Sequence, residues 1–199
     1  RKISATREEI PMILRVEAKP PVGPLPLMAL GQHMAPVRGA AFADDGRTVL
    51  TCAHDDALMV WSSASGTCEA VLQCGVGGAR ALDVTPDGTR CVIGGNDGSV
   101  VVWDIPERRC LARFAAHDGA IESVAITNEG AFAVACGADG AVSGWDVVSR
   151  SRRFTHRPTG IASPVCVAVN RDGSTVAVGG LTNHDARPVN QAACLLDGG

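Results

Sequence analysis

A histidine, a hydroxyl residue and an aspartate lie within 23 positions of one another near the start of the chain, as His33, Thr51 and Asp55. These residue types could form a catalytic triad. In such a triad a carboxylate orients an imidazole, and the imidazole takes the proton of a hydroxyl nucleophile. A nucleophile of this kind would hydrolyse an ester or an amide. A hydrolase is therefore one function that the rest of the chain has to support or weaken.

The surroundings of these residues recur along the chain. Three segments align without a gap, and they are residues 46–61, 88–103 and 130–145. Their tryptophans are 42 and 42 positions apart, at Trp61, Trp103 and Trp145. A fourth unit begins at the turn Asp172-Gly173 and has Leu196 in the place of the tryptophan. A catalytic triad is not repeated in this way, so the regular spacing favours a repeated structural unit.

Each unit has the pattern of four short strands separated by tight turns. The segments 37–43, 79–85, 121–127 and 165–170 are short and apolar with partial alternation, and each is followed by a turn such as Asp-Gly or Glu-Gly. Glycine supplies the positive φ that a hairpin turn requires. Two further strands follow in each unit, and an apolar segment precedes it, as at residues 68–73 and 109–115. We expect an all-β fold with about four strands per unit.

These residues resemble the WD-repeat β-propeller family. The resemblance covers residues 25–199 and rests on four units of about 42 residues, on Trp103-Asp104 and Trp145-Asp146, and on partial matches at Trp61-Ser62 and Leu196-Asp197. Gln32-His33 and Ala116-His117 stand where the family has Gly-His. The resemblance implies blades of four-stranded antiparallel sheets and a function as a non-enzymatic scaffold for protein–protein contacts. It favours that function over a hydrolase.

The resemblance also implies a structural tetrad in each blade, in which His, Ser or Thr, Asp and Trp share side-chain hydrogen bonds. The first unit has the full set, whereas the second has Ile93 and the third Ala135 in the place of the hydroxyl. The fourth unit retains none of it. The residues assigned to these tetrads are His33, Thr51, Asp55, Trp61, Asp97, Trp103, His117, Asp139 and Trp145.

Composition limits the classes of partner. The chain has 18 Lys and Arg against 21 Asp and Glu, a net charge of −3, so a general electrostatic affinity for nucleic acid is not expected. No apolar run approaches the length of about 18 residues that a membrane helix needs.

The eight cysteines include no CxxC pair. We expect reduced thiols, no cofactor, no metal site and an intracellular location in cytoplasm or nucleus, including cytoskeletal or ciliary assemblies.

Two features could bind partners. The first is a set of seven arginines expected on one side of the molecule, suited to a phosphate, lipid headgroup, RNA or acidic peptide, with a solvated strand edge as the alternative. It comprises Arg108, Arg109, Arg113, Arg150, Arg152, Arg153 and Arg157. The second is an insertion of eight residues in the fourth unit, expected to form a polar loop at residues 181–191. The residues of interest there are His184, Asp185 and Arg187.

Four units raise the question of ring closure, because each blade buries its faces against its neighbours. Residues 25–30 could supply a fourth strand to the last unit and close a four-bladed ring. The alternative, which we favour, is that the chain is part of a longer propeller, completed by further blades of the same or another chain. Residues 1–24 are then expected to be a Pro-rich linker or upstream segment. Other proteins, within a larger assembly, are the expected partners.

Overall fold

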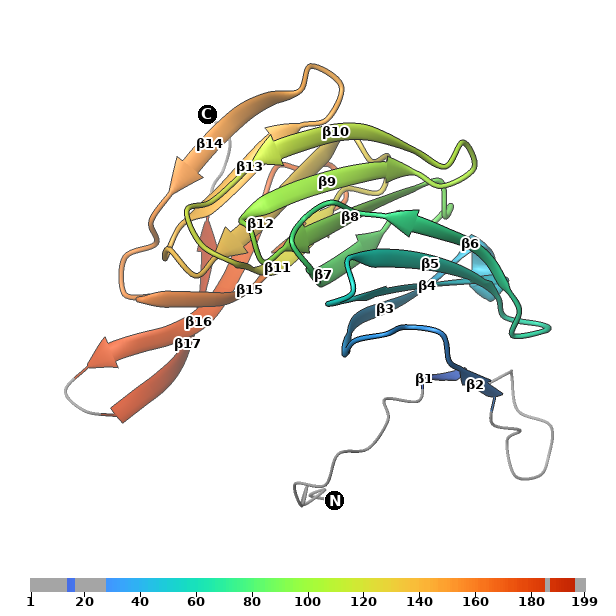
Figure 1. Ribbon diagram of the computed structural model, residues 1–199. Coiled ribbons are helices and arrows are strands. Elements are labelled where there is room, and N and C mark those ends of the chain that lie inside the picture. Colours follow the sequence, from blue (N-terminus) through green and yellow to red (C-terminus); the bar gives the residue numbers. More distant parts are fainter. Residues whose placement is uncertain (1–13, 17–27, 185–186, 196–199) are drawn as a thin grey trace, which may run out of the picture.

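The computed structural model describes residues 14–16, 28–184 and 187–195, and for residues 30–181 it also describes the side chains. Four antiparallel sheets, here called blades 1 to 4, follow one another along the chain (Figure 1). Blade 1 contains β3 (Val37–Ala43), β4 (Thr48–Ala53), β5 (Ala57–Ser62) and β6 (Cys68–Gln73). Blade 2 contains β7 (Ala79–Val84), β8 (Arg90–Gly95), β9 (Ser99–Asp104) and β10 (Arg109–Ala115).

Blade 3 contains β11 (Ile121–Ile126), β12 (Phe132–Gly137), β13 (Val142–Asp146) and β14 (Ser151–His156). Blade 4 contains β15 (Ser163–Val169), β16 (Val176–His184) and β17 (Arg187–Leu195). A short 3-10 turn (Asp44–Gly46) follows β3, and the described residues contain no α-helix. The sheets fan around their first strands β3, β7, β11 and β15, which lie next to one another, with β6, β10 and β14 at the outer edges (Figure 1). The all-β expectation is confirmed.

Turn glycines separate the strands as expected. The turn between β7 and β8 places Gly88 at φ 71°, and the equivalent turn between β11 and β12 places Gly130 at φ 67°. Side chains other than Asn and Asp rarely adopt this left-handed conformation. The repeated glycine therefore determines where each first strand ends and the second begins.

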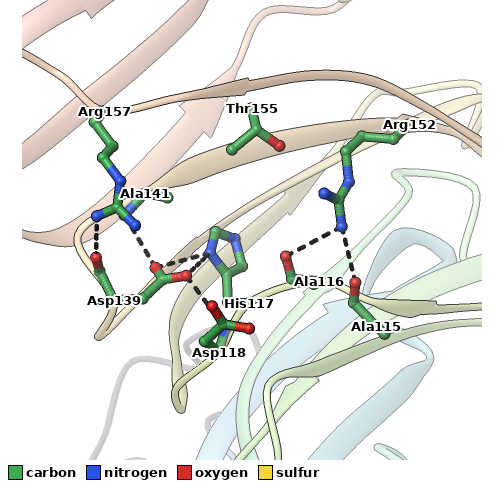
Figure 2. A pocket seen from close by; sticks show the side chains of 9 residues that line it. All are labelled: Ala115, Ala116, His117, Asp118, Asp139, Ala141, Arg152, Thr155 and Arg157. Atoms are coloured by element: carbon green, nitrogen blue, oxygen red, sulfur yellow. Dashed lines mark hydrogen bonds and ion pairs between the residues drawn. The ribbon is translucent and has the colours of Figure 1, made fainter.

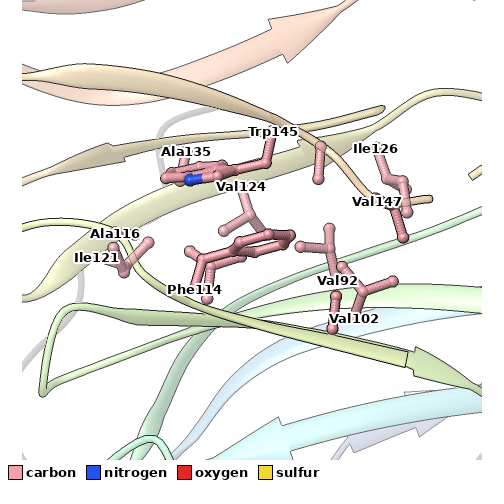
Figure 3. Close-up of a cluster of buried hydrophobic side chains, with 13 residues drawn as sticks. Val92, Val102, Phe114, Ala116, Ile121, Val124, Ile126, Ala135, Trp145 and Val147 are labelled. Carbon is pink, nitrogen blue, oxygen red and sulfur yellow. The ribbon is translucent and has the colours of Figure 1, made fainter. Parts of the chain in front are cut away.

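The core lies between the blades. Between blades 2 and 3, the ring of Phe114 stacks on Trp145 with centroids 5.3 Å apart, surrounded by aliphatic side chains from both sheets such as Val102 and Ile121 (Figure 3). Similar clusters fill the spaces between blades 1 and 2 and between blades 3 and 4. Full burial of one large apolar side chain contributes about 1.5–3 kcal/mol. Packing between blades therefore keeps the edges and loops of each sheet in fixed positions.

Residues 25–30 were considered as a fourth strand for the last unit. Within them the structure describes β2 (Met28–Leu30), and this strand pairs with β1 (Leu14–Val16). Blade 4 has three strands among the described residues, β15, β16 and β17. The suggestion that residues 25–30 complete blade 4 is therefore wrong for this structure. Three residues of the expected linker, 14–16, lie in β1.

The insertion in the fourth unit is also different from the expectation. Instead of a loop at 181–191, β16 and β17 continue as a long hairpin of nine residues each, with Thr182 opposite Val189 and His184 opposite Arg187. An insertion with an even number of residues can lengthen both strands equally, so the alternation of faces is kept. Leu196 lies outside the described residues.

Candidate functional site

In blade 1 the structure brings together the four side chains of the expected tetrad. The indole N–H of Trp61 donates to Thr51 Oγ1 at 2.9 Å, and Thr51 Oγ1 lies 2.7 Å from His33 Nε2. His33 Nδ1 lies 2.9 Å from a carboxylate oxygen of Asp55. Because an indole can only donate, the hydroxyl proton of Thr51 is left for His33 Nε2, and the ring proton of His33 is then on Nδ1, facing Asp55.

Asp55 also fixes the backbone around this tetrad. Its carboxylate accepts hydrogen bonds from the N–H groups of Met34, at 2.8 Å, and Ala57, at 3.1 Å. Burial alone would raise the pKa of Asp55, but these hydrogen bonds and the His33 ring outweigh it and hold the pKa below its usual value. The segment that carries His33 is thereby joined to the turn between β4 and β5.

The geometry of this set does not suit nucleophilic catalysis. The side chain that would act as nucleophile belongs to Thr51, which is only 1% exposed. Its oxygen already accepts the N–H of Trp61. A substrate carbonyl has no access to it, so the arrangement stabilises the blade.

Blade 3 contains three of the four tetrad residues, and of these His and Asp are hydrogen-bonded to each other. His117 Nδ1 lies 3.0 Å from the Asp139 carboxylate, which also accepts the N–H groups of Asp118 and Ala141. The His117 ring meets Trp145 edge-on, at 6.2 Å between centroids. Since Ala135 has no hydroxyl, His117 Nε2 is buried without a hydrogen-bond partner.

Blade 2 has no such network. The indole N–H of Trp103 is buried and unpartnered, because Ile93 stands in the place of the hydroxyl. Asp97 accepts the N–H of Ser99 at 2.8 Å and so caps its own turn. The structure thus places Asp97 and Trp103 in equivalent positions of the blade but does not connect them.

The arginines do not share one side of the molecule. A register shift in β14 places Arg152 opposite Trp145, and the guanidinium lies 5.9 Å from the centre of that ring, on the face toward blade 2. Arg153 lies over the ring of Phe132 on the other face and pairs with Asp146 at 2.7 Å. The arginines therefore lie along the outer strands, as expected, but on both faces of them, and the β-bulge decides which of Arg152 and Arg153 takes which face.

Most of these arginines bind partners within the chain. Arg113 donates to the carbonyls of Cys74 and Gly75 in the link between blades 1 and 2, and Arg109 lies 3.8 Å from the Asp104 carboxylate. Arg108 reaches the carbonyl of Glu69 at 3.4 Å. The contacts of Arg113 and Arg108 connect the outer strand of blade 2 to blade 1 and its link, whereas that of Arg109 lies within blade 2.

Arg152 and Arg157 flank a pocket of about 220 Å³ between β14 and the link from β10 to β11 (Figure 2). Its lining consists of Ala115, Ala116, His117, Asp118, Asp139, Ala141, Arg152, Thr155 and Arg157. Arg152 donates to the carbonyl of Ala115 at 2.9 Å, and Arg157 donates to the carbonyl of Asp139. The pocket therefore has two fixed cationic groups at its rim.

Several polar contacts between blades were not predicted from the sequence. The carboxylate of Asp56 accepts N–H groups of Gly75, Val76 and Gly78, at 2.9, 2.9 and 3.2 Å. A glycine-rich segment can hold a phosphate in this manner, but here the chain's own carboxylate occupies the amides. The partners are backbone groups, so no pairing of residue types marked this contact in the sequence.

The joint between blades 2 and 3 has two further polar contacts. Arg80 pairs with Glu122 at 2.9 Å, and Asp83 accepts the N–H of Ile126 at 2.9 Å. Burial raises the pKa of Asp83 despite this hydrogen bond. Both contacts join β7 to β11, and they fix the angle between the two sheets.

The remaining expected residues lie in the long hairpin. His184 and Arg187 are opposite one another in the β16–β17 ladder, and Asp185 lies outside the described residues. Among the described residues, no three His, Cys, Asp or Glu side chains are grouped so that they could hold a metal ion. No helix in that part of the chain is long and apolar enough to cross a membrane.

Comparison with known proteins agrees with this architecture. A family model described as "WD domain, G-beta repeat" matches residues 25–62, 66–104 and 108–146, more than half of the chain. Each match covers the first three strands of blade 1, 2 or 3 and the segment before them, which for blades 2 and 3 is the outer strand of the preceding blade, β6 or β10. A comparison with curated protein sequences finds no match. On the evidence of these three consecutive repeats and of the blades they form, the chain belongs to the WD40 repeat family.

Proposed function

We propose that this chain is a non-enzymatic scaffold that presents its blade edges and loops to partner proteins within a multisubunit assembly. WD40 repeats generally mediate protein–protein interaction, and proteins of this family are typically not enzymes. The observation that carries the proposal is the position of Met34. Its side chain is 91% exposed, yet its backbone N–H is held by Asp55 of the blade 1 tetrad. Because the backbone at Met34 is already fixed, only the rotamer freedom of its side chain is lost when a partner covers it.

The proposal is tested by isolating the tagged chain from its source and measuring by native mass spectrometry which subunits accompany it. We expect co-isolated subunits that are depleted when Met34→Ser replaces the apolar side chain. Val148→Ser is the matched control, because Val148 is also exposed (77%) but lies in the turn between β13 and β14. A chain that is isolated without any partner would contradict the proposal. Ester or amide hydrolysis that is lost in Thr51→Val would favour the hydrolase instead.

We further propose an intracellular location, in cytoplasm or nucleus. The seven cysteines whose side chains the structure describes are free thiols, and Cys52, Cys74, Cys91 and Cys136 among them are buried in the core. Burial raises the pKa of Cys52 and of Cys136 to about 12, which keeps both thiols protonated and unreactive. Free thiols are typical of reducing compartments. Partners of the assembly would include further blades, from this chain or another.

A second candidate function is the binding of an acidic partner. It is favoured by one observation, that Arg113, Arg152 and Arg157 are positioned by neutral carbonyl oxygens. A carbonyl holds a guanidinium without compensating its charge, so these groups can still attract an anion.

A further inference from the structure

We propose that the pocket beside β14 binds the carboxylate of a glutamate or aspartate side chain of a partner protein. The inference deepens the second candidate function and rests on it. It assigns the binding to Arg152 and Arg157, with Thr155 between them, and to no other arginine of the chain.

The register of β14 brings these three residues to one face. Arg152 is opposite Trp145 and Thr155 is opposite Ser143, two positions earlier on β13, so both side chains point toward blade 2. Arg157 follows Thr155 by two positions and also lines the pocket. The β-bulge is the reason that Arg152, rather than Arg153, joins this face. In Figure 2 the two guanidinium groups flank Thr155 on opposite sides.

Both guanidinium groups are held in place before any ligand arrives. Arg152 donates from one terminal nitrogen to the carbonyl of Ala115 at 2.9 Å and lies over the ring of Trp145. Arg157 donates to the carbonyl of Asp139. A guanidinium has five N–H donors, so each group keeps further donors for a carboxylate. Side chains that are already ordered lose little entropy on binding, which favours affinity.

The lining also contains two carboxylates, those of Asp118 and Asp139, and the Asp139 carboxylate lies beside Arg157 (Figure 2). The Asp139 carboxylate is already hydrogen-bonded to the His117 ring and to two backbone N–H groups, and these bonds hold its pKa below the usual value against the effect of burial. Asp118 is the other carboxylate of the lining and projects below the His117–Asp139 pair, whereas both guanidinium groups lie above it (Figure 2).

Other arginines of the outer strands are in a different situation. Arg153 pairs with the Asp146 carboxylate at 2.7 Å, and Arg109 lies 3.8 Å from that of Asp104. Their charges are compensated within the chain. They therefore provide a control that removes the same number of positive charges from outside the pocket.

Size and net charge favour one acidic side chain over a polyanion. A pocket of about 220 Å³ admits a single side chain. The chain carries a net charge of −3, which repels nucleic acid and anionic membranes over long distances. The affinity for a single carboxylate between two guanidinium groups depends mainly on the charges that line the pocket, because salt screens the charges farther away.

The test uses the full chain and a fluorophore-labelled pentapeptide with one glutamate among glycines and capped termini, with binding measured by fluorescence anisotropy near physiological ionic strength. We expect Arg152→Gln with Arg157→Gln to weaken binding about tenfold, as for the loss of one charge-assisted contact of moderate strength. The control Arg109→Gln with Arg153→Gln should retain the affinity within about twofold, although it changes the net charge equally. Equal losses in the two variants would overturn the proposal.

Two further measurements make the result independent of folding. In the unaltered chain, the side-chain Nε–Hε signals of Arg152 and Arg157 should shift on addition of the peptide, while those of Arg109 and Arg153 should not. Arg152→Lys with Arg157→Lys keeps the charge but loses the planar fork, so it should bind several times more weakly.

Competition identifies the anion. Acetate should displace the peptide at least as well as inorganic phosphate does; stronger displacement by phosphate would overturn the assignment to a carboxylate. If the unaltered chain does not bind the peptide but still co-isolates with partner subunits, the pocket assignment is wrong and the scaffold function stands.

Discussion

Replacing Ala135 by threonine should complete the hydrogen-bonded tetrad of blade 3. Ala135 occupies the position that Thr51 has in blade 1, and each of the two residues is at most 1% exposed. In blade 1 the Thr51 hydroxyl makes two hydrogen bonds, of 2.7 Å to His33 and 2.9 Å to Trp61. In blade 3 the corresponding His117 Nε2 is buried without a partner. A hydroxyl at residue 135 would supply that partner.

The magnitude follows from these contacts. A hydrogen bond contributes about 0.5–1.5 kcal/mol net, and an unsatisfied buried polar group costs about 1–3 kcal/mol. Two new bonds that also satisfy His117 should therefore be worth about 2 kcal/mol. The added volume carries its own cost of about 1–3 kcal/mol in a packed core. Valine has nearly the same shape as threonine, so Ala135→Val carries that packing cost without the hydroxyl.

The assay is urea denaturation followed by far-ultraviolet circular dichroism, on the unaltered chain and on both variants. We expect the free energy of unfolding to be about 2 kcal/mol higher for Ala135→Thr than for Ala135→Val. The slopes of that free energy against urea concentration should be similar in the two variants. Equal stabilities of the two variants would refute the reasoning, because they would show that the hydroxyl finds neither His117 nor the indole of Trp145.

The remaining predictions concern the tetrad, its carboxylate, the thiols and one glycine. Thr51→Val should lower the free energy of unfolding by about 2 kcal/mol, measured by urea denaturation, whereas an unchanged midpoint would contradict the role of the tetrad. The pKa of Asp55 is lowered in the folded state, so its stabilisation is present above the unfolded pKa of about 4 and is lost as pH falls further. Urea midpoints measured from about pH 5 to pH 2 should therefore fall less steeply in Asp55→Asn than in the unaltered chain, and parallel curves would exclude this contribution. Iodoacetamide should alkylate the exposed Cys110 in the native protein, and it should modify Cys52, whose pKa is raised to about 12 by burial, only after unfolding; mass spectrometry distinguishes the two sites. Gly95→Ala should cost about 3 kcal/mol or prevent folding, because the added Cβ overlaps a backbone carbonyl of the link between blades 1 and 2, and a soluble variant of native stability would contradict that close approach.

The strands were predictable because their signals are local. Residues 37–43 were expected to form a strand from alternation and a following turn, and β3 spans Val37–Ala43. The tryptophan spacing of 42 fixed the number of residues per blade. The resemblance to WD-repeat propellers implied the contacts that join His33, Thr51 and Asp55. Repetition made these predictions possible, since each unit could be compared with the others.

The faces of the arginines could not be predicted in this way. The orientation of Arg152 and Arg153 depends on a register shift opposite Trp145, and a strand's sequence does not show where a bulge lies. The partners of Arg113, Arg152 and Arg157 are carbonyl oxygens, which every residue has. The carboxylate of Asp56 likewise binds backbone amides. Contacts with the backbone leave no pairing of residue types to detect.

The three tryptophans have a consequence for spectroscopy. The chain has three tryptophans and no tyrosine, and each blade from 1 to 3 contains one indole. The N–H of Trp61 is hydrogen-bonded and that of Trp103 is not, while the ring of Trp145 is stacked on Phe114. Three such environments should give three resolved indole proton resonances. Each blade can then be followed separately by NMR, without isotopic labelling, while a ligand is titrated or the temperature is raised.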